Sequence, residues 1–276
     1  MGLIFYDTHA HLDYQDFAQD IEQVVERAQA AGITRIISIG TDFESSRRCV
    51  QLAEKFSSVY AAVGWHPNDA MAAPDDLRPH LKELALHPKV VAIGETGLDY
   101  YRMPSAQNNG TPEDDESFKT KQAQVFQQQL ELAAELGLNC VIHQRDVQGS
   151  NACFEDIMKL MVPFAGRVRG QFHCFAGDAT AMRRVLDAGS IVSFTGISTF
   201  KNGQNIRDTI AATPPDKFML ETDCPFLAPI PYRGKRCEPA YVKEISEVVA
   251  KAKNCSLEEL SAGTRATAHS FFPKLK

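Results

Sequence analysis

The 276-residue chain has no run of apolar residues long enough to span a membrane, for which about 18 would be needed. Its first apolar stretch, residues 3–6, is too short for the hydrophobic part of a secretion signal and is followed at once by charge. The seven cysteines are odd in number and include no C-x-x-C pair, so we expect reduced thiols and neither a disulfide framework nor a cysteine metal site. These absences favour a cytoplasmic protein without membrane contact.

An excess of basic residues is also missing. The formal net charge is −6 and the isoelectric point is about 5.8, which excludes a protein that holds a duplex with a broad basic surface. Contact with nucleic acid would therefore have to be local, through a site or a bound metal. The composition, 44% apolar and 23% charged, is ordinary for a globular protein with a sizeable core. No linker or low-complexity segment interrupts it, so we expect one domain over residues 1–276 and no obligate protein partner.

Short apolar runs rich in β-branched residues alternate with longer amphipathic runs. The expected strands are residues 3–7, 35–40, 59–64, 90–94, 140–143, 169–173, 191–196 and 218–223. The expected helices are residues 16–32, 43–56, 75–87, 118–137, 150–161, 178–189 and 202–212, with further helices from about 238 onward. Strand–helix alternation implies parallel strands with right-handed crossovers, and eight units in this length predict a closed α/β (β/α)8 TIM barrel.

One connection differs from the others in length and polarity. Residues 102–117, RMPSAQNNGTPEDDES, contain two prolines and a glycine and follow the fourth expected strand. A polar segment of this length indicates a mobile loop, which could act as a lid over a site at that end of the barrel.

Metal-binding residue types fall at the ends of the expected strands. In a parallel barrel the carboxyl ends of the strands share one face, and catalytic residues lie there. The candidates are His9 and His11 after the first strand, His66 after the third, Glu95 after the fourth, His143 after the fifth, His173 after the sixth and Asp223 after the eighth. The remaining three histidines of the eight fall on expected helices or at their ends.

The segment DTHAHLD at residues 7–13 carries two of these histidines. Residues i and i+2 of a strand point the same way, so His9 and His11 could chelate one cation. Each motif alone is weak, because strand histidines are often half-buried polar residues, but burying this many imidazole and carboxylate groups without a cation would be costly. The donors suit zinc, manganese, cobalt, nickel, iron or magnesium. The candidate metal ligands are His9, His11, Glu95, His143, His173 and Asp223. Six ligands exceed what one tetrahedral ion needs, so we expect two divalent metal ions (Mg, Mn or Zn) that share Glu95.

The motifs DTHAHLD, GWHPND, VVAIGETGLDYY, VIHQRD, QFHCFAG and LETDCPFLAPIPYRGKRCEPAYV resemble, in this order, those of the TatD family of metal-dependent deoxyribonucleases within the amidohydrolase superfamily. The resemblance runs from residue 7 to about 242. It departs at Trp65, Cys237 and Thr267, where the family usually has other residues, and none of these is a candidate ligand.

The resemblance implies a (β/α)8 barrel with one or two divalent ions that hydrolyses DNA, often as a 3′-to-5′ exonuclease on single strands. It implies one ion held by His9, His11, Glu95 and Asp223, and another held by Glu95, His143 and His173. His66 would contact the substrate phosphate. We interpret Asp223 and Glu95 as the catalytic residues of a two-metal phosphodiester hydrolysis in which Asp223 accepts or steers the proton of the attacking water.

Residues near the expected mouth could bind the DNA substrate. Arg145 lies two residues beyond His143 and should face the same way, so we predict that it binds substrate. Other basic candidates are Lys201, Arg233, Lys235 and Arg236, and the aromatic candidates for base stacking are Tyr100, Tyr101 and Phe175, for each of which core packing is an equal alternative. Strand alternation predicts that Cys174 and Cys224 point away from the mouth and serve as packing residues.

Two other functions remain compatible with the same metal-binding residues. Barrels of the amidohydrolase type also cleave amides, esters and lactones, and some proteins similar to TatD resemble deacylases of mischarged tRNA, so a D-aminoacyl-tRNA deacylase is the main alternative. A phosphatase or other phosphoesterase acting on small molecules is another. A binding protein without catalysis is disfavoured by the intact set of candidate ligands.

Overall fold

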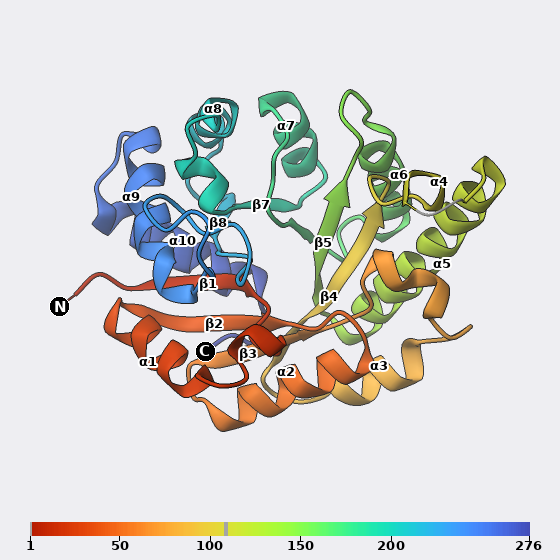
Figure 1. Cartoon of the computed structure of the whole chain (residues 1–276), viewed down its shortest axis with the longest axis horizontal. Helices are drawn as coiled ribbons and strands as arrows, with labels where there is room; N and C mark the ends of the chain where they lie inside the picture. Colours follow the sequence, from red (N-terminus) through yellow and green to blue (C-terminus); the bar gives the residue numbers. More distant parts are fainter. Residues whose placement is uncertain (1, 108–109) are drawn as a thin grey trace.

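Eight parallel strands follow one another in chain order around a barrel in the computed structural model, which describes residues 2–107 and 110–276 (Figure 1). This confirms the predicted (β/α)8 architecture. The strands are β1 Phe5–Ala10, β2 Ile33–Ile39, β3 Val59–Val63, β4 Val90–Asp99, β5 Asn139–Arg145, β6 Gly170–Phe172, β7 Ile191–Phe194 and β8 Phe218–Leu220.

The barrel closes between its first and last strands. A parallel bridge joins Ala10 to Cys224, just beyond the end of β8. Two backbone hydrogen bonds flank it, from Asp223 N to His9 O at 2.9 Å and from His11 N to Cys224 O at 2.8 Å. Closure of the barrel therefore brings three candidate metal ligands, from opposite ends of the chain, into adjacent positions.

Helices follow the strands and cover the outside of the barrel (Figure 1). The principal ones are α1 Ile21–Ala30, α2 Phe43–Lys55, α3 Arg78–Ala85, α5 Pro112–Leu136, α6 Ala152–Met161, α7 Ala179–Asp187, α8 Gln204–Ala212, α9 Val242–Lys253 and α10 Leu257–Phe271. No helix within the described residues is both long and apolar enough to cross a membrane.

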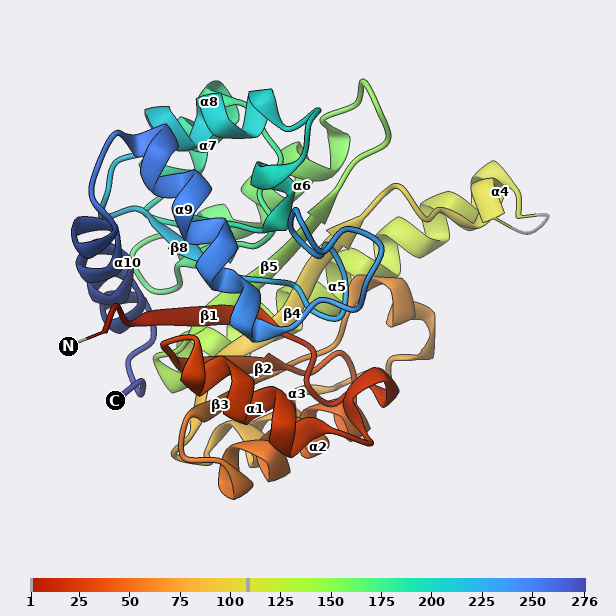
Figure 2. The same cartoon turned by 60° about the vertical axis from the view of Figure 1, so that its left-hand side comes forward.

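The connection after β4 is more regular than its composition suggests. Most of it is helical, because α4 spans Pro104–Gln107 and α5 already begins at Pro112. Thr111 caps α5: its hydroxyl accepts from Asp114 N, and the Asp114 carboxylate accepts from Thr111 N, as in a capping box. The prediction of a long loop over residues 102–117 is therefore wrong for residues 104–107 and 112–117, which are helical. Residues 108 and 109 of the predicted loop lie outside the described residues. Figure 2 shows α4 and the start of α5 projecting beyond the rest of the barrel.

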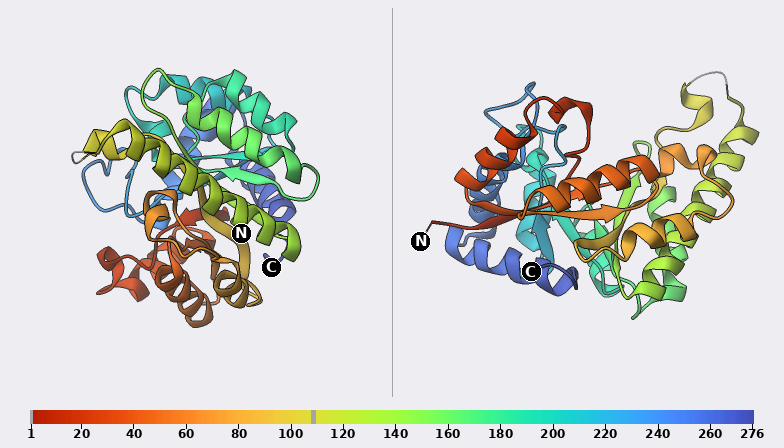
Figure 3. Two further views of the ribbon diagram at one scale, coloured as in Figure 1. Left: turned by 90° about the vertical axis from the view of Figure 1, so that its right-hand side faces the viewer. Right: turned by 90° about the horizontal axis from the view of Figure 1, so that it is seen from below.

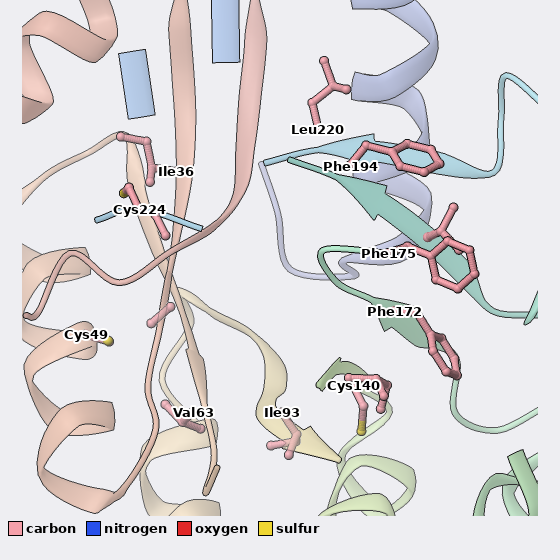
Figure 4. Packing of buried hydrophobic residues seen from close by; sticks show 14 of the residues in the cluster. Ile36, Cys49, Val63, Ile93, Cys140, Phe172, Phe175, Phe194, Leu220 and Cys224 are labelled. Atoms are coloured by element: carbon pink, nitrogen blue, oxygen red, sulfur yellow. The ribbon is translucent and has the colours of Figure 1, made fainter. Parts of the chain in front are cut away.

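The core has two parts, one on each side of the strands. Figure 4 shows members of the outer part, including Ile36, Val63 and Ile93, packed between strands and helices. The inner part joins alternate strand residues, such as Ile37 and Ile39, to the C-terminal segment. That segment contributes Phe271, Phe272 and Leu275. Because alternate residues of a strand share a face, the inner part fills the barrel and the C-terminal segment seals the end opposite the candidate ligands.

Two buried glutamines of α5 fix the ends of β3 and β4. The Gln129 amide accepts from Trp65 N at 2.8 Å and donates to Trp65 O at 3.0 Å. Gln122, two helical turns earlier, accepts from Asp99 N at 2.9 Å and donates to Asp99 O at 3.1 Å. Figure 3 shows α5 running across the outside of the barrel. The long helix thereby holds the backbone beside His66 and at the end of β4.

We predict that Gln129→Leu lowers the free energy of unfolding by about 2–4 kcal/mol, because the peptide N–H and C=O of buried Trp65 lose their partners. Urea unfolding followed by circular dichroism measures this. Gln127→Leu is the matched control: Gln127 is exposed on the same helix, and its side chain donates to the surface carboxylate of Glu131. Equal midpoints for the two variants would contradict the role of Gln129.

Candidate metal centre

The first group of candidate ligands surrounds one oxygen of Glu95. His9 Nε2 and His11 Nε2 lie 3.3 Å apart. Glu95 Oε2 is 3.5 Å from His9 Nε2 and 3.4 Å from His11 Nε2. Asp223 Oδ1 lies 3.5 Å from each of the same two nitrogens. Four donor atoms from β1, β4 and the segment after β8 therefore meet in one cluster.

The second group surrounds the other oxygen of the same carboxylate. Glu95 Oε1 lies 2.8 Å from His143 Nδ1, 2.9 Å from His173 Nε2 and 3.3 Å from His66 Nε2. His143 Nδ1 is in turn 3.2 Å from His66 Nε2 and 3.4 Å from His173 Nε2. Glu95 thus stands between the two groups, the position that the sequence predicts for a shared ligand.

The distances in the first group fit a bound divalent cation. Donors held at about 2.0–2.1 Å from one tetrahedral ion lie about 3.3–3.4 Å apart. The distances of 3.3–3.5 Å around Glu95 Oε2 match this spacing. Imidazole nitrogens and carboxylate oxygens, with no cysteine in either group, are the donors that zinc and manganese accept. The residues could therefore hold a metal, and the ligand role of each one stays a prediction.

Register shifts in two strands aim the donors into the barrel mouth. The pairing of β1 with β2 shifts between Asp7 and Ala10, around His9. The pairing of β4 with β5 shifts between Ile93 and Thr96, around Glu95. A bulge adds a residue on one strand and redirects the side chains beside it. His9 and His11 face the same cluster, as strand alternation predicts. The backbone around them is not a regular strand, however, because the register shifts at this point.

The carboxylates of the cluster remain charged despite their burial. Burial would raise the pKa of Glu95, but the charges of His173 and His66 and hydrogen bonds from the surrounding imidazoles hold it well below its usual range. The pKa of Asp223 is lowered against burial in the same way, first by the His11 imidazole, whose Nε2 lies 3.5 Å from Asp223 Oδ1, and then by the charges of His9 and His173. Burial also opposes protonation of His173, yet the charges of Glu95 and Glu221 raise its pKa well above the usual value. Without metal, protons on imidazoles balance the carboxylates, and a bound cation would replace them.

Two buried acids that the sequence motifs did not single out, Asp99 and Glu221, face the ring nitrogens of His143 and His173 that point away from Glu95. Asp99 Oδ2 lies 3.0 Å from His143 Nε2, and the other oxygen of Asp99 accepts from Tyr101 N and Arg102 N. Glu221 Oε1 lies 3.6 Å from His173 Nδ1. Carboxylates in this position fix the tautomer and orientation of a metal-binding imidazole. Their spacing was a usable signal, since Asp99 is four residues after Glu95 and Glu221 is two before Asp223.

A cavity of about 630 Å³ opens above the donor groups. Arg102 and Arg145 line it, which agrees with the predicted place of Arg145. Lys201, Arg233, Lys235 and Arg236 do not line it, and Arg236 is instead held by Asp20 and Glu238. The cationic side of the mouth therefore comes from the ends of β4 and β5 and not from the segment RGKR.

The structure places the candidate cysteines and aromatic residues either in the cavity wall or in the core. The prediction that Cys174 points away from the mouth is wrong. Cys174 lines the cavity, because the backbone turns to a φ of 46° directly after His173 and ends the strand alternation. Cys224 is buried as expected. Tyr100 and Phe175 are buried, so core packing describes them. Tyr101 is half exposed, with the Arg145 guanidinium 4.0 Å above its ring.

The family model described as "TatD related DNase" matches residues 6–273. A protein of Bacillus subtilis, YabD, described as an uncharacterized metal-dependent hydrolase, is 38% identical over 270 residues, which cover 98% of this chain and 99% of that protein. A Klebsiella pneumoniae protein named 3'-5' ssDNA/RNA exonuclease TatD is 31% identical, with 97% of each chain covered. The crystal structure of the TatD homologue YJJV from Escherichia coli superposes with a TM-score of 0.83 at 26% identity, over 98% of each chain.

We predict that Glu95→Gln weakens metal binding by more than the roughly 100-fold that the loss of a supporting residue costs, because both donor groups lose their common charge. Isothermal titration with Zn²⁺ or Mn²⁺ into metal-stripped protein measures this. Glu116→Gln is the control and should bind metal as the wild type does, because Glu116 is an exposed acid that pairs with Lys119. Wild-type affinity in Glu95→Gln would show that the cluster does not hold metal.

We predict that Asp99→Asn lowers metal affinity by about 10- to 100-fold while every donor atom stays in place, because His143 loses the carboxylate that orients it. The same titration applies, with the thermal midpoint recorded to detect loss of folding. Asp76→Asn, at an exposed carboxylate paired with Arg78, should leave the affinity unchanged. A folded Asp99→Asn protein with unaltered affinity would rule out this support.

Proposed function

The chain belongs to the TatD-related DNase family and is a metal-dependent hydrolase, and we propose that it removes nucleotides from the 3′ end of single-stranded DNA. The observation that carries the proposal is the pair of donor groups around Glu95, at the floor of a cavity lined by Arg102 and Arg145. A relative named as an exonuclease on single-stranded DNA and RNA, similar over nearly the whole chain, supports the same reaction.

We propose that the two groups hold two divalent ions, Mg²⁺, Mn²⁺ or Zn²⁺. His9, His11, Glu95 and Asp223 would hold one, and Glu95, His143 and His173 the other, with the two oxygens of Glu95 divided between them. When bound, such ions lower the pKa of water and neutralise negative charge on a phosphate. The chain supplies what positions the reactants around them.

Asp223 is the residue that we propose as general base. Its side chain is 15% exposed, whereas Glu95 is 2% exposed, so Asp223 is the acid of the cluster that a water molecule and a substrate can reach from the cavity. The neighbouring His11 imidazole lowers the pKa of Asp223 and keeps it ionised, which is the state in which a carboxylate can accept a proton from the attacking water. Glu95 acts in catalysis by holding both donor groups in place.

His66 and Arg145 are proposed to bind the substrate phosphate. His66 lines the cavity with its Nε2 atom 3.3 Å from Glu95 Oε1, so a phosphate at the second donor group would lie beside it. Arg145 lies at the end of β5, two residues beyond His143, and also lines the cavity. The Arg145 guanidinium lies over the Tyr101 ring, 4.0 Å from its centroid, and a phosphate in the cavity could reach it there.

The test is a time course on a 5′-labelled single-stranded DNA oligonucleotide, with metal-stripped protein refilled with Mg²⁺, Mn²⁺ or Zn²⁺. We expect a ladder that shortens from the 3′ end and needs metal. Asp223→Asn should lower kcat by about 10²–10⁴-fold, the usual contribution of a general base. Asp216→Asn, at an exposed acid beside Lys217, is the control and should retain full activity.

A flat trace with every metal, from protein shown to bind ions, would contradict the deoxyribonuclease proposal. The same preparations would then be assayed on a D-aminoacyl-tRNA and on a small phosphodiester. Cleavage of the first would indicate the deacylase alternative, and cleavage of the second a phosphoesterase acting on small molecules.

A further inference from the structure

We propose that Phe226 forms a stacking surface for a nucleobase at the 3′ end of the substrate, with Tyr14 beside it at the edge of the base. The proposal rests on the proposed function and adds to it a binding subsite that requires an unpaired base. It assigns a role to Phe226, a residue that carries no metal-binding or acid–base chemistry of its own.

Phe226 occupies a position that packing does not explain. Its side chain is 51% exposed, although exposing a large aromatic ring to water is unfavourable. Other large apolar side chains with comparable exposure are present, but among the described residues Phe226 is the only one of them that lines the cavity above the donor groups. Aromatic side chains commonly line ligand cavities, so the exposed Phe226 ring at the mouth of this cavity is placed to contact a ligand.

The ring belongs to an aromatic wall that ends at a candidate metal ligand. The Tyr14 ring stacks on the imidazole of His11, with centroids 4.8 Å apart and an interplanar angle of 24°. The Phe226 ring lies 6.1 Å from Tyr14 and 6.5 Å from His11, between centroids, and stands edge to face with both, at 80° and 67°. A base stacked on the face of Phe226 would therefore lie close to the first donor group.

The backbone holds Phe226 in register with Asp223. Phe226 N donates to Asp223 O at 3.0 Å, which closes a turn. Asp223 and Leu227, on either side, have φ values of 58° and 55°, a region that non-glycine residues occupy only where the surroundings fix them. The stacking surface and the proposed general base are thus parts of one rigid turn, so a base placed on the ring has a defined position relative to Asp223.

The other side of the mouth complements this wall in charge. Phe226 and Tyr14 come from segments next to β8 and β1, whereas Arg102 and Arg145 follow β4 and β5, halfway around the eight-stranded barrel. The cavity of about 630 Å³ is of a size typical for small-ligand sites and therefore offers an aromatic surface on one side and cations on the other. A nucleotide carries both a flat ring and a negative charge, whereas a simple aliphatic ester would leave Phe226 without a partner.

Stacking on an aromatic side chain requires a base that has left a duplex and tolerates any sequence, because every base has a π face. The subsite would therefore favour frayed or single-stranded 3′ ends and show little preference among the four bases. It would discriminate strongly against ends that lack a base.

The test compares Phe226→Ala with the wild type on two oligonucleotides, one normal and one carrying abasic residues at both 3′-terminal positions. We expect Phe226→Ala to raise KM for the normal oligonucleotide by about 5- to 150-fold, the range expected for loss of one base stack, with kcat within about twofold. The abasic oligonucleotide should show no difference between variant and wild type. Phe226→Trp should restore the wild-type KM.

Leu86→Ala is the control. Leu86 is an exposed apolar residue away from the residues that line the cavity, so the variant should behave as the wild type does on both substrates. A wild-type KM in Phe226→Ala, or an equal loss on the abasic oligonucleotide, would overturn the proposal.

A binding measurement distinguishes the stacking subsite from the proposed exonuclease reaction. Fluorescence anisotropy would measure the binding of an oligonucleotide that has phosphorothioate linkages at its 3′ end. If the wild type binds this oligonucleotide through Phe226 but cleaves no DNA, the stacking subsite stands and the proposed reaction fails.

Discussion

One buried carboxylate, Glu95, determines the arrangement of the site. Five imidazoles meet within a few ångströms of one another, and rings that can carry positive charge would repel unless an anion lay among them. Glu95 supplies that anion at 2% exposure, with one oxygen toward His9 and His11 and the other toward His66, His143 and His173. A buried charge is tolerated only when it is fully paired. The cluster therefore needs cations, whether protons on the imidazoles or metal ions.

The supporting structure follows from this requirement. Asp99 and Glu221 face the outer nitrogens of His143 and His173, so the positive charge that surrounds Glu95 is itself balanced from behind. Glu221 is in turn held by Ser193 and Gln171 inside the barrel. This polar layer separates the donor groups from the apolar inner core that the C-terminal segment seals. The barrel is thus apolar at its closed end and charged at its open end.

Much of the fold and of the cluster could be predicted because both depend on periodic patterns. Alternating strands and helices predict the barrel, and the barrel geometry places His143 and His173 together although they lie 30 residues apart. What the sequence did not reveal depends on local backbone geometry. The turn at Cys174 ends the strand alternation, and the helices α4 and α5 occupy most of a segment whose composition favours a loop. Phe226 was missed because its exposure results from a tight turn, which no periodicity encodes.

The closure of the barrel between β1 and β8 has a consequence for how the protein is made. The bonds that join the two strands connect residues separated by most of the chain, and the hydrogen bond from Thr222 to Asp7 spans 215 positions. During synthesis His9 and His11 leave the ribosome long before Asp223 does. The first donor group is therefore incomplete in every nascent chain that ends before Asp223, and it forms only after the segment that follows β8 has docked against β1.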